Sequence, residues 1–186
     1  MNIEQERLEA LEILYYSNIE NLIDKDQRFF RFQGKPKFDF FQNEDIRIFG
    51  KQKNNVIFLN IFAIDEAYRR KASDEVEYFL LHEIRHLFQH EEVFCLNNNS
   101  EIAIGSDIIR KWDYEFSHYS PATDEKGNAS QAYAKQDCEI DAYAFAYGVM
   151  KYKGKDVDKL FLPPESKIEI LKMSEEWVKQ FKSENI

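Results

Sequence analysis

The chain has 186 residues, 44% of them hydrophobic and 15% aromatic, which is enough for one well-filled core and rather little for two. Its formal net charge of −9 argues against a general nucleic-acid binder, because such binding needs clustered Lys and Arg. The acidic start, MNIEQERLEALEILYY, has neither the basic region of a signal peptide nor a membrane span. We therefore expect a single cytoplasmic domain over residues 1–186, with no membrane or nucleic-acid partner, that acts on polypeptide or small molecules.

The first part of the chain changes from a helical pattern to a strand pattern. Apolar residues three or four positions apart predict an amphipathic helix within residues 1–24 that covers the core. Aromatic and β-branched residues broken by polar pairs predict a small antiparallel sheet over residues 30–64, with GKQKNN as a hairpin connection. The segment VIFLNI, residues 56–61, is predicted to be an edge strand that could bind an extended peptide by strand addition.

The second part of the chain is predicted to be helical, which makes the fold class α+β. Ser73 suits the position that caps a helix, and acidic residues follow it. The turn-rich segment SPATDEKGNAS is expected to be a mobile loop between two helices. The predicted helices span residues 73–93, 106–118, 130–152 and 164–183.

The sequence HEIRH, from His82 to His86, lies in the predicted helix over residues 73–93. Two histidines four residues apart project from one helical face, so both imidazoles can bind one ion. This is the H-E-x-x-H arrangement, in which the histidines hold Zn²⁺ and the glutamate is the general base for a water at the metal. We therefore predict His82 and His86 as zinc ligands and Glu83 as the base. Histidines satisfied at the surface or in the core, without a metal, are the alternative.

Zinc needs a third protein ligand, and two further histidines are candidates. His90 lies about 12 Å along a straight helix from His82, and the glycine that turns the chain in longer zinc motifs is absent. It suits the C-terminal end of a helix, where its charge is favourable. His118, at the edge of the predicted loop, could bind the metal or donate a hydrogen bond to the developing oxyanion.

Glu139 is the strongest candidate for the third ligand. Ala142 and Ala146 lie on nearly the same helical face, so another helix could approach Glu139 closely. The alternative is a solvated glutamate among alanines that only favour the helix. Asp141 points roughly to the opposite side and is a weaker ligand candidate, suited to a contact behind the ligands or at the surface.

HEIRH followed by a second helix with EIDAYAFA resembles the gluzincin pattern, in particular the ImmA/IrrE-like metallo-endopeptidases. In that family an H-E-x-x-H helix is followed by a helix of the form E-x-E-A-N-x-F-A. The resemblance covers about residues 55–150. It implies a zinc held by His82, His86 and Glu139, with Glu83 as base, in a minimal zincin-like fold whose small sheet lies beside the active-site helix.

Two residues depart from that family pattern. Arg85 replaces a small residue, and its own helix has no acid three or four positions away. Its carboxylate partner must therefore come from elsewhere in the fold, or else Arg85 faces the cleft and selects acidic substrate groups. Tyr143 replaces Asn or Asp and could bond a ligand or stabilise an oxyanion, although a core tyrosine is the commoner role. The candidate oxyanion donors are Tyr114, His118, Tyr119, Tyr133 and Tyr143.

Together these expectations predict a zinc-dependent peptidase that hydrolyses a peptide bond in a protein or peptide substrate. Glu83 would take a proton from the attacking water and later deliver one to the leaving amine. The alternative is a catalytically weak or inactive metal-binding module that acts by docking a regulatory protein partner. A third hypothesis is a toxin peptidase that is exported without a signal peptide.

Overall fold

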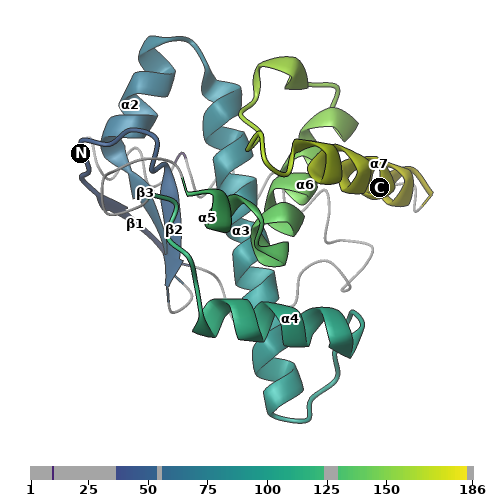
Figure 1. The fold of residues 1–186 in the computed structure, drawn as a ribbon. Coiled ribbons are helices and arrows are strands. Elements are labelled where there is room, and N and C mark those ends of the chain that lie inside the picture. Colours follow the sequence, from purple (N-terminus) through teal and green to yellow (C-terminus); the bar gives the residue numbers. More distant parts are fainter. Residues whose placement is uncertain (1–9, 11–36, 54–55, 124–129, 184–186) are drawn as a thin grey trace.

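The computed structural model describes residues 10, 37–53, 56–123 and 130–183. Within these residues the fold is α+β, as predicted: a small sheet lies beside a larger set of helices (Figure 1). The predicted covering helix at residues 1–24 lies, apart from Ala10, outside the described residues. Among the helices described, none combines the length and the apolar character that crossing a bilayer requires.

The sheet is mixed, with strand order β1-β3-β2. β2 pairs antiparallel with β3, but GKQKNN is not the connection that the sequence predicted, because its first four residues form β2 itself. β1 pairs parallel with β3, so the all-antiparallel sheet is wrong as well. Because β3 pairs with β1 on one side and with β2 on the other, VIFLN forms the central strand, and the predicted edge strand is wrong. Within the described part of the chain, β1 and β2 are the edges. The strands are β1 (Lys37–Phe41), β2 (Gly50–Lys53) and β3 (Val56–Asn60).

Asn60 ends the central strand and begins a helix, α2 (Ile61–Arg69), that the strand prediction over residues 30–64 missed. The Asn60 side chain accepts a hydrogen bond from the Phe62 amide, which caps the helix. Its amide group donates to the carbonyl oxygens of Asn43 and Ile48, on the chain between β1 and β2. These long-range bonds fix Asn60 as a cap, and no local pattern in NVIFLNIF reveals them.

The H-E-x-x-H motif lies in α3 (Ser73–Asn97), which starts at the predicted residue and runs past the expected end at residue 93. The predicted cap is wrong, because Ala72 precedes the helix and no side chain caps it. The helix stops where Asn99 adopts a left-handed conformation with φ of 54°. The amide of Ser100 then bonds to the Cys95 carbonyl oxygen at 2.8 Å, which satisfies the last turn. The next helix, α4 (Ser106–Ser117), agrees with the prediction to within a residue.

The predicted helix over residues 130–152 is divided into α5 (Gln131–Ala134) and α6 (Asp137–Tyr152). Glu115 of α4 explains where α6 begins. Its carboxylate accepts the backbone amides of Asp137 and Cys138 at 2.7 and 2.8 Å, which are unpaired donors at a helix start. The cap comes from another helix, so local propensity could not place it. The last described elements are a 3-10 turn, η1 (Val157–Lys159), and α7 (Lys167–Ser183), which begins three residues after Pro164.

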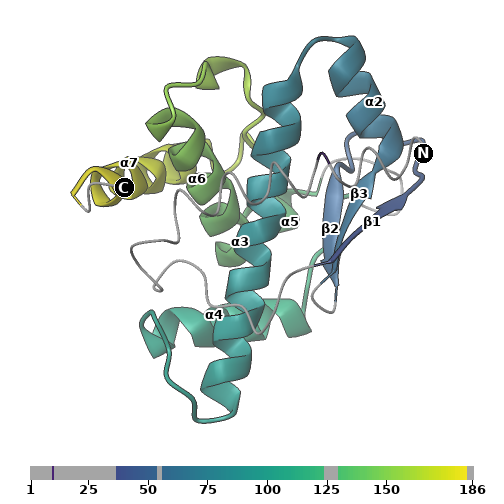
Figure 2. The same ribbon diagram turned by 180° about the vertical axis from the view of Figure 1, so that it is seen from behind.

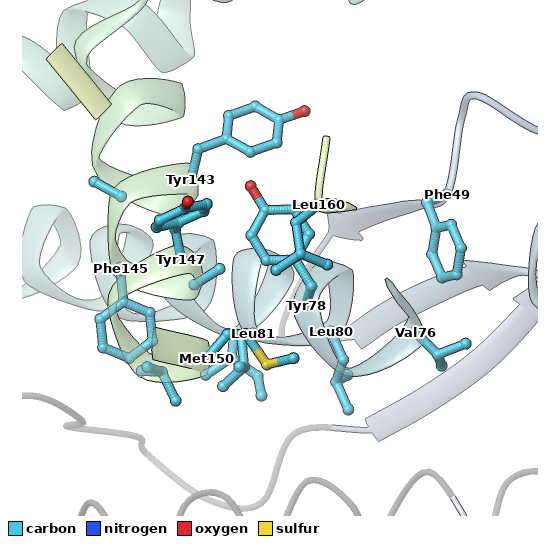
Figure 3. Close-up of a cluster of buried hydrophobic side chains, with 14 of the residues drawn as sticks. Phe49, Val76, Tyr78, Leu80, Leu81, Tyr143, Phe145, Tyr147, Met150 and Leu160 are labelled. Atoms are coloured by element: carbon cyan, nitrogen blue, oxygen red, sulfur yellow. The ribbon is translucent and has the colours of Figure 1, made fainter. Parts of the chain in front are cut away.

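Helix α3 runs through the middle of the fold. Both ribbon views show the sheet and α2 on one side of it and α6 and α7 on the other, with α4 crossing its C-terminal part (Figure 1, Figure 2). Two apolar clusters fix α3 against its neighbours. The larger joins α3, α6 and the sheet (Figure 3) and includes Tyr78, Leu80, Leu81, Phe145, Met150 and Leu160. The smaller joins α3, α4 and the start of α6 and consists of Phe88, Ile109, Trp112 and Cys138.

Candidate metal centre

Three of the predicted ligands converge between α3 and α6. His82 Nε2 and His86 Nε2 are 3.0 Å apart. The Glu139 carboxylate faces both, with Oε2 3.3 Å from His82 Nε2 and Oε1 3.4 Å from His86 Nε2. One donor atom from each residue lies within 4.8 Å of the others, and all three residues are buried. The buried group could therefore hold a metal ion, as the sequence predicted.

The packing of α6 on α3 brings the three ligands together. His82 and His86 are one turn apart on α3, and Glu139 lies in the first turn of α6. Ala142 and Ala146, on the same face as Glu139, are fully buried, as expected if they allow close approach of another helix. Glu115 fixes the start of α6, and the smaller apolar cluster packs beside it. The position of Glu139 is thus set by contacts from three helices.

The chemistry of the group suits a divalent cation. Glu139 Oε2 is buried without a hydrogen-bond partner, and so is His82 Nδ1. A buried acceptor without a donor is costly, and an ion at the centre would satisfy it. Two imidazoles and one carboxylate form the donor set of many zinc enzymes, and other first-row divalent ions accept the same donors. The residues fit a metal, while the donor set alone leaves its identity open.

Charges within the group are strongly coupled. Burial would lower the pKa of His86, but the neighbouring Glu139 carboxylate outweighs burial and raises it to about 9. The pKa of His82 is lowered, chiefly by burial. Although burial acts in the opposite direction, His86 and His82 hold the pKa of Glu139 well below its ordinary value. The Glu139 carboxylate thus favours a proton on His86, and a bound cation would compete with that proton.

Glu83, the predicted base, lies next to this group in a nearly dry position. Burial raises its pKa to about 7; the charge of His86 lowers it and that of Glu139 raises it. The first residue of β2 packs directly on the side chain: a Cβ built on Gly50 would lie 2.9 Å from Glu83 Cγ and 3.1 Å from Oε1. A carboxylate with a pKa near neutrality is well matched to proton transfer at pH 7.

Tyrosines line the remaining sides of the candidate centre. The Tyr119 hydroxyl donates to Glu139 Oε1 at 2.6 Å. The residue as a whole is part-exposed, but burial around the hydroxyl and the nearby carboxylate raise its pKa. The ring of Tyr143 is buried 4.2 Å from the His82 ring, measured between centroids. Tyr133 lies edge-on to Tyr119 with centroids 6.1 Å apart. Of the five predicted oxyanion donors, these three are close to the ligands or to one another.

Two other histidines lie outside the group. His118 is exposed, its ring stacks on Tyr114, and its Nδ1 lies 2.9 Å from the Tyr114 carbonyl oxygen. The His90 ring stacks on Phe116 with centroids 3.9 Å apart. Neither belongs to the set of ligand atoms that could share an ion among the described residues. A catalytic role for His118 stays a prediction that this arrangement does not support.

Arg85 is buried and paired with Asp141 on α6. Its Nε donates to Asp141 Oδ2 at 2.7 Å and its Nη2 to Oδ1 at 3.2 Å. The expectation of a carboxylate from elsewhere in the fold is confirmed, and the alternative of an arginine facing the cleft is wrong. Sequence reasoning missed Gln89, which lies between His86 and Asp141 and bonds to both. Its spacing of three residues from His86 on one helix was the available signal.

Comparisons with protein families, with curated proteins and with solved structures returned no match. The resemblance to gluzincins therefore rests on the two sequence motifs alone.

Proposed function

We propose that the chain is a metal-dependent peptidase, with zinc as the ion, that hydrolyses a peptide bond in a protein or peptide. The observation that carries this proposal is the buried group of His82, His86 and Glu139 with Glu83 beside it. A buried acid with a pKa near 7 next to two imidazoles and a carboxylate is the arrangement that metal-assisted hydrolysis requires.

The roles of the residues follow from their positions. His82, His86 and Glu139 would hold the ion, which when bound polarises the substrate carbonyl and makes a water acidic enough to attack at neutral pH. Glu83 takes the proton of the attacking water and passes it to the nitrogen of the leaving amine. With a pKa of about 7, a large share of Glu83 is ionised and ready to accept that proton at neutral pH.

Tyr119 is the favoured oxyanion donor among the predicted candidates. Its hydroxyl already reaches a ligand oxygen, Glu139 Oε1, while 47% of the residue is exposed toward solvent, from which a substrate must arrive. A hydroxyl in this position could turn from the carboxylate to the developing oxyanion and donate to it. Tyr143 is less suited, because its ring is buried against His82.

β2 replaces β3 as the strand we propose for substrate binding. Among the described strands it is an edge of the sheet, and its first residue, Gly50, lies against the Glu83 side chain. An extended peptide that pairs with β2 would pass in front of the base, and backbone hydrogen bonds would hold it whatever its side chains. This supports a polypeptide substrate rather than a sugar or nucleotide.

The test is Glu83→Gln in the full chain, loaded with zinc and incubated with unfolded casein and with a mixture of proteome-derived peptides. We expect zinc to stay bound and the rate of cleavage to fall by about 10²–10⁴-fold. Glu75→Gln, a surface change on the same helix, should cleave as the wild type does. Cleavage by Glu83→Gln at the wild-type rate would refute the proposal.

A metal-binding interaction module is the second candidate, favoured by large apolar side chains on the surface. In that case neither substrate is cleaved, zinc still binds, and Glu83→Gln changes no cellular phenotype. The exposed side chains include Phe62, Tyr68, Phe94, Tyr114, Phe161 and Ile168.

A further inference from the structure

Gln89 links the candidate metal centre to a buried ion pair. It lies one turn after His86 on α3 and is fully buried. Its Oε1 is 2.8 Å from His86 Nδ1. Its Nε2 donates to the Cys138 carbonyl oxygen at 2.9 Å and to Asp141 Oδ2 at 2.8 Å. Both polar atoms of this side chain are therefore hydrogen-bonded: Oε1 to an imidazole, and Nε2 to a backbone carbonyl oxygen and a carboxylate oxygen.

The direction of these bonds follows from the partners. A carbonyl oxygen and a carboxylate oxygen only accept, so both require the NH₂ group of Gln89. The carbonyl end of Gln89 then faces His86, and it can only accept. His86 Nδ1 must therefore carry a proton and donate it. In a neutral imidazole this leaves the lone pair on Nε2, the atom that faces Glu139 and His82.

Arg85 holds the far end of this link in place. It binds Asp141 through two hydrogen bonds, and the pair is almost fully removed from water. Its guanidinium lies 4.3 Å from the ring centroid of Phe88 and 4.7 Å from that of Trp177. These two ring contacts limit the movement of Arg85, so the Asp141 carboxylate that it binds is held where it accepts from Gln89.

We propose that Gln89 is a positioning residue for the metal, which transmits the fixed polarity of the Arg85 and Asp141 pair to His86 and keeps Nε2 free to bind the ion. The inference rests on the metal centre of the proposed function and adds to it the device that prepares one ligand. His82 differs, because its Nδ1 is buried without a hydrogen-bond partner. The two histidines are thus unequal: His86 has its tautomer set by protein bonds, and His82 is held by packing against Tyr143.

Gln89→Met tests the proposal, because methionine has a similar length and keeps the helix but offers neither bond. We expect zinc affinity, measured by competition with a chelator of known strength, to weaken by about 10–100-fold. Two-bond ¹H–¹⁵N spectra of the zinc-loaded wild type should show His86 protonated at Nδ1 and coordinated through Nε2. In Gln89→Met the His86 signals should broaden or divide, since the ring is free to turn.

Ser174→Ala is the matched control for a general loss of stability. Ser174 is also fully buried and loses one hydrogen bond, to the Leu171 carbonyl oxygen, on α7 away from the ligands. It should lower the melting temperature and leave zinc affinity and the His86 spectrum unchanged. If Gln89→Met also lowers only the melting temperature and binds zinc as tightly as the wild type, the positioning role is refuted.

A paired exchange guards against a variant that merely misfolds. Gln89→Glu together with Asp141→Asn keeps the net charge, an acceptor beside His86 and a donor to residue 89, and it gives up the bond to the Cys138 carbonyl oxygen. It should bind zinc more tightly than Gln89→Met, and equal or weaker binding in the folded protein would also refute the proposal. Tight zinc binding by a wild type that cleaves nothing would refute the peptidase and leave this role standing, whereas a wild type without zinc binding would refute both.

Discussion

The two ends of α6 are both buried against α3, but by different physics. At the C-terminal end, Met150 lies in the apolar cluster with Leu81 and Tyr78, where contact area alone provides stability. At the N-terminal end, Glu139 and Asp141 are charged and buried, and each depends on specific partners. A truncated side chain at the C-terminal end of α6 should therefore lower only the stability of the fold. Removal of a polar group at the N-terminal end should also alter the candidate metal centre.

Glu139→Ala should have the largest effect on this contrast. It removes the one carboxylate that joins both imidazoles in the candidate ligand group of the described residues, so we expect bound zinc to be lost in metal analysis after dialysis. Glu169→Ala, at an exposed position on α7, should retain the metal. Unaltered zinc content in Glu139→Ala would return His118 as the candidate third ligand.

Arg85→Met should be the most destabilising single change at the polar end. It leaves the Asp141 carboxylate buried without its partner, and we expect the free energy of unfolding to fall by about 3–5 kcal/mol in urea titrations. Arg110→Met, on the surface of α4, should be close to neutral. Adding Asp141→Asn to Arg85→Met should recover part of the loss, and no recovery would contradict the role of the uncompensated charge.

Met150→Ala tests the apolar end. The cavity it leaves should lower the free energy of unfolding by about 2–5 kcal/mol. Zinc affinity, measured in the fraction that remains folded, should equal that of the wild type, because no ligand touches this part of the core. A parallel loss of zinc affinity would show that the two ends of α6 are not separable.

Gly50→Ala should change the free energy of unfolding least among these variants, and its effect should be confined to the Glu83 side chain. The added Cβ would meet Glu83 at 2.9 Å, so the carboxylate must shift while the metal ligands stay. We expect kcat/KM to fall by about 10–100-fold, with zinc content unchanged. Gly105→Ala is the matched control, since a Cβ there meets nothing within 4 Å. Equal activity of both variants would show that Glu83 is not held by β2.

The ligands could be predicted because their positions depend mostly on helix periodicity. Four-residue spacing places His82 and His86 together in any straight helix. Glu139 is distinguished by the alanines on its own face of the second helix, which the structure shows to be buried. The α+β class followed from the same patterns. What stays untested is the chemistry: hydrolysis, the identity of the ion and the roles of His118 and Tyr143 are still predictions.

The errors share a different cause, which is dependence on contacts far apart in the sequence. The parallel pairing of β1 with β3 depends on which side of the hairpin the first strand meets. The end of β3 depends on hydrogen bonds from Asn60 to residues before β2. Gln89 was missed because a polar residue near the end of an apolar run gives no hint of the Asp141 carboxylate that it meets.

The cap that Glu115 provides has a consequence for how the centre assembles. Because its carboxylate accepts the amides of Asp137 and Cys138, we expect these two amide protons to exchange with solvent faster when the contact between α4 and α6 opens. Glu139 is in the same turn, so release of α4 would also loosen the third ligand. Amide exchange at these two residues should therefore slow when zinc is added. The exchange rates of Asp137 and Cys138 would then measure, residue by residue, whether the metal is bound.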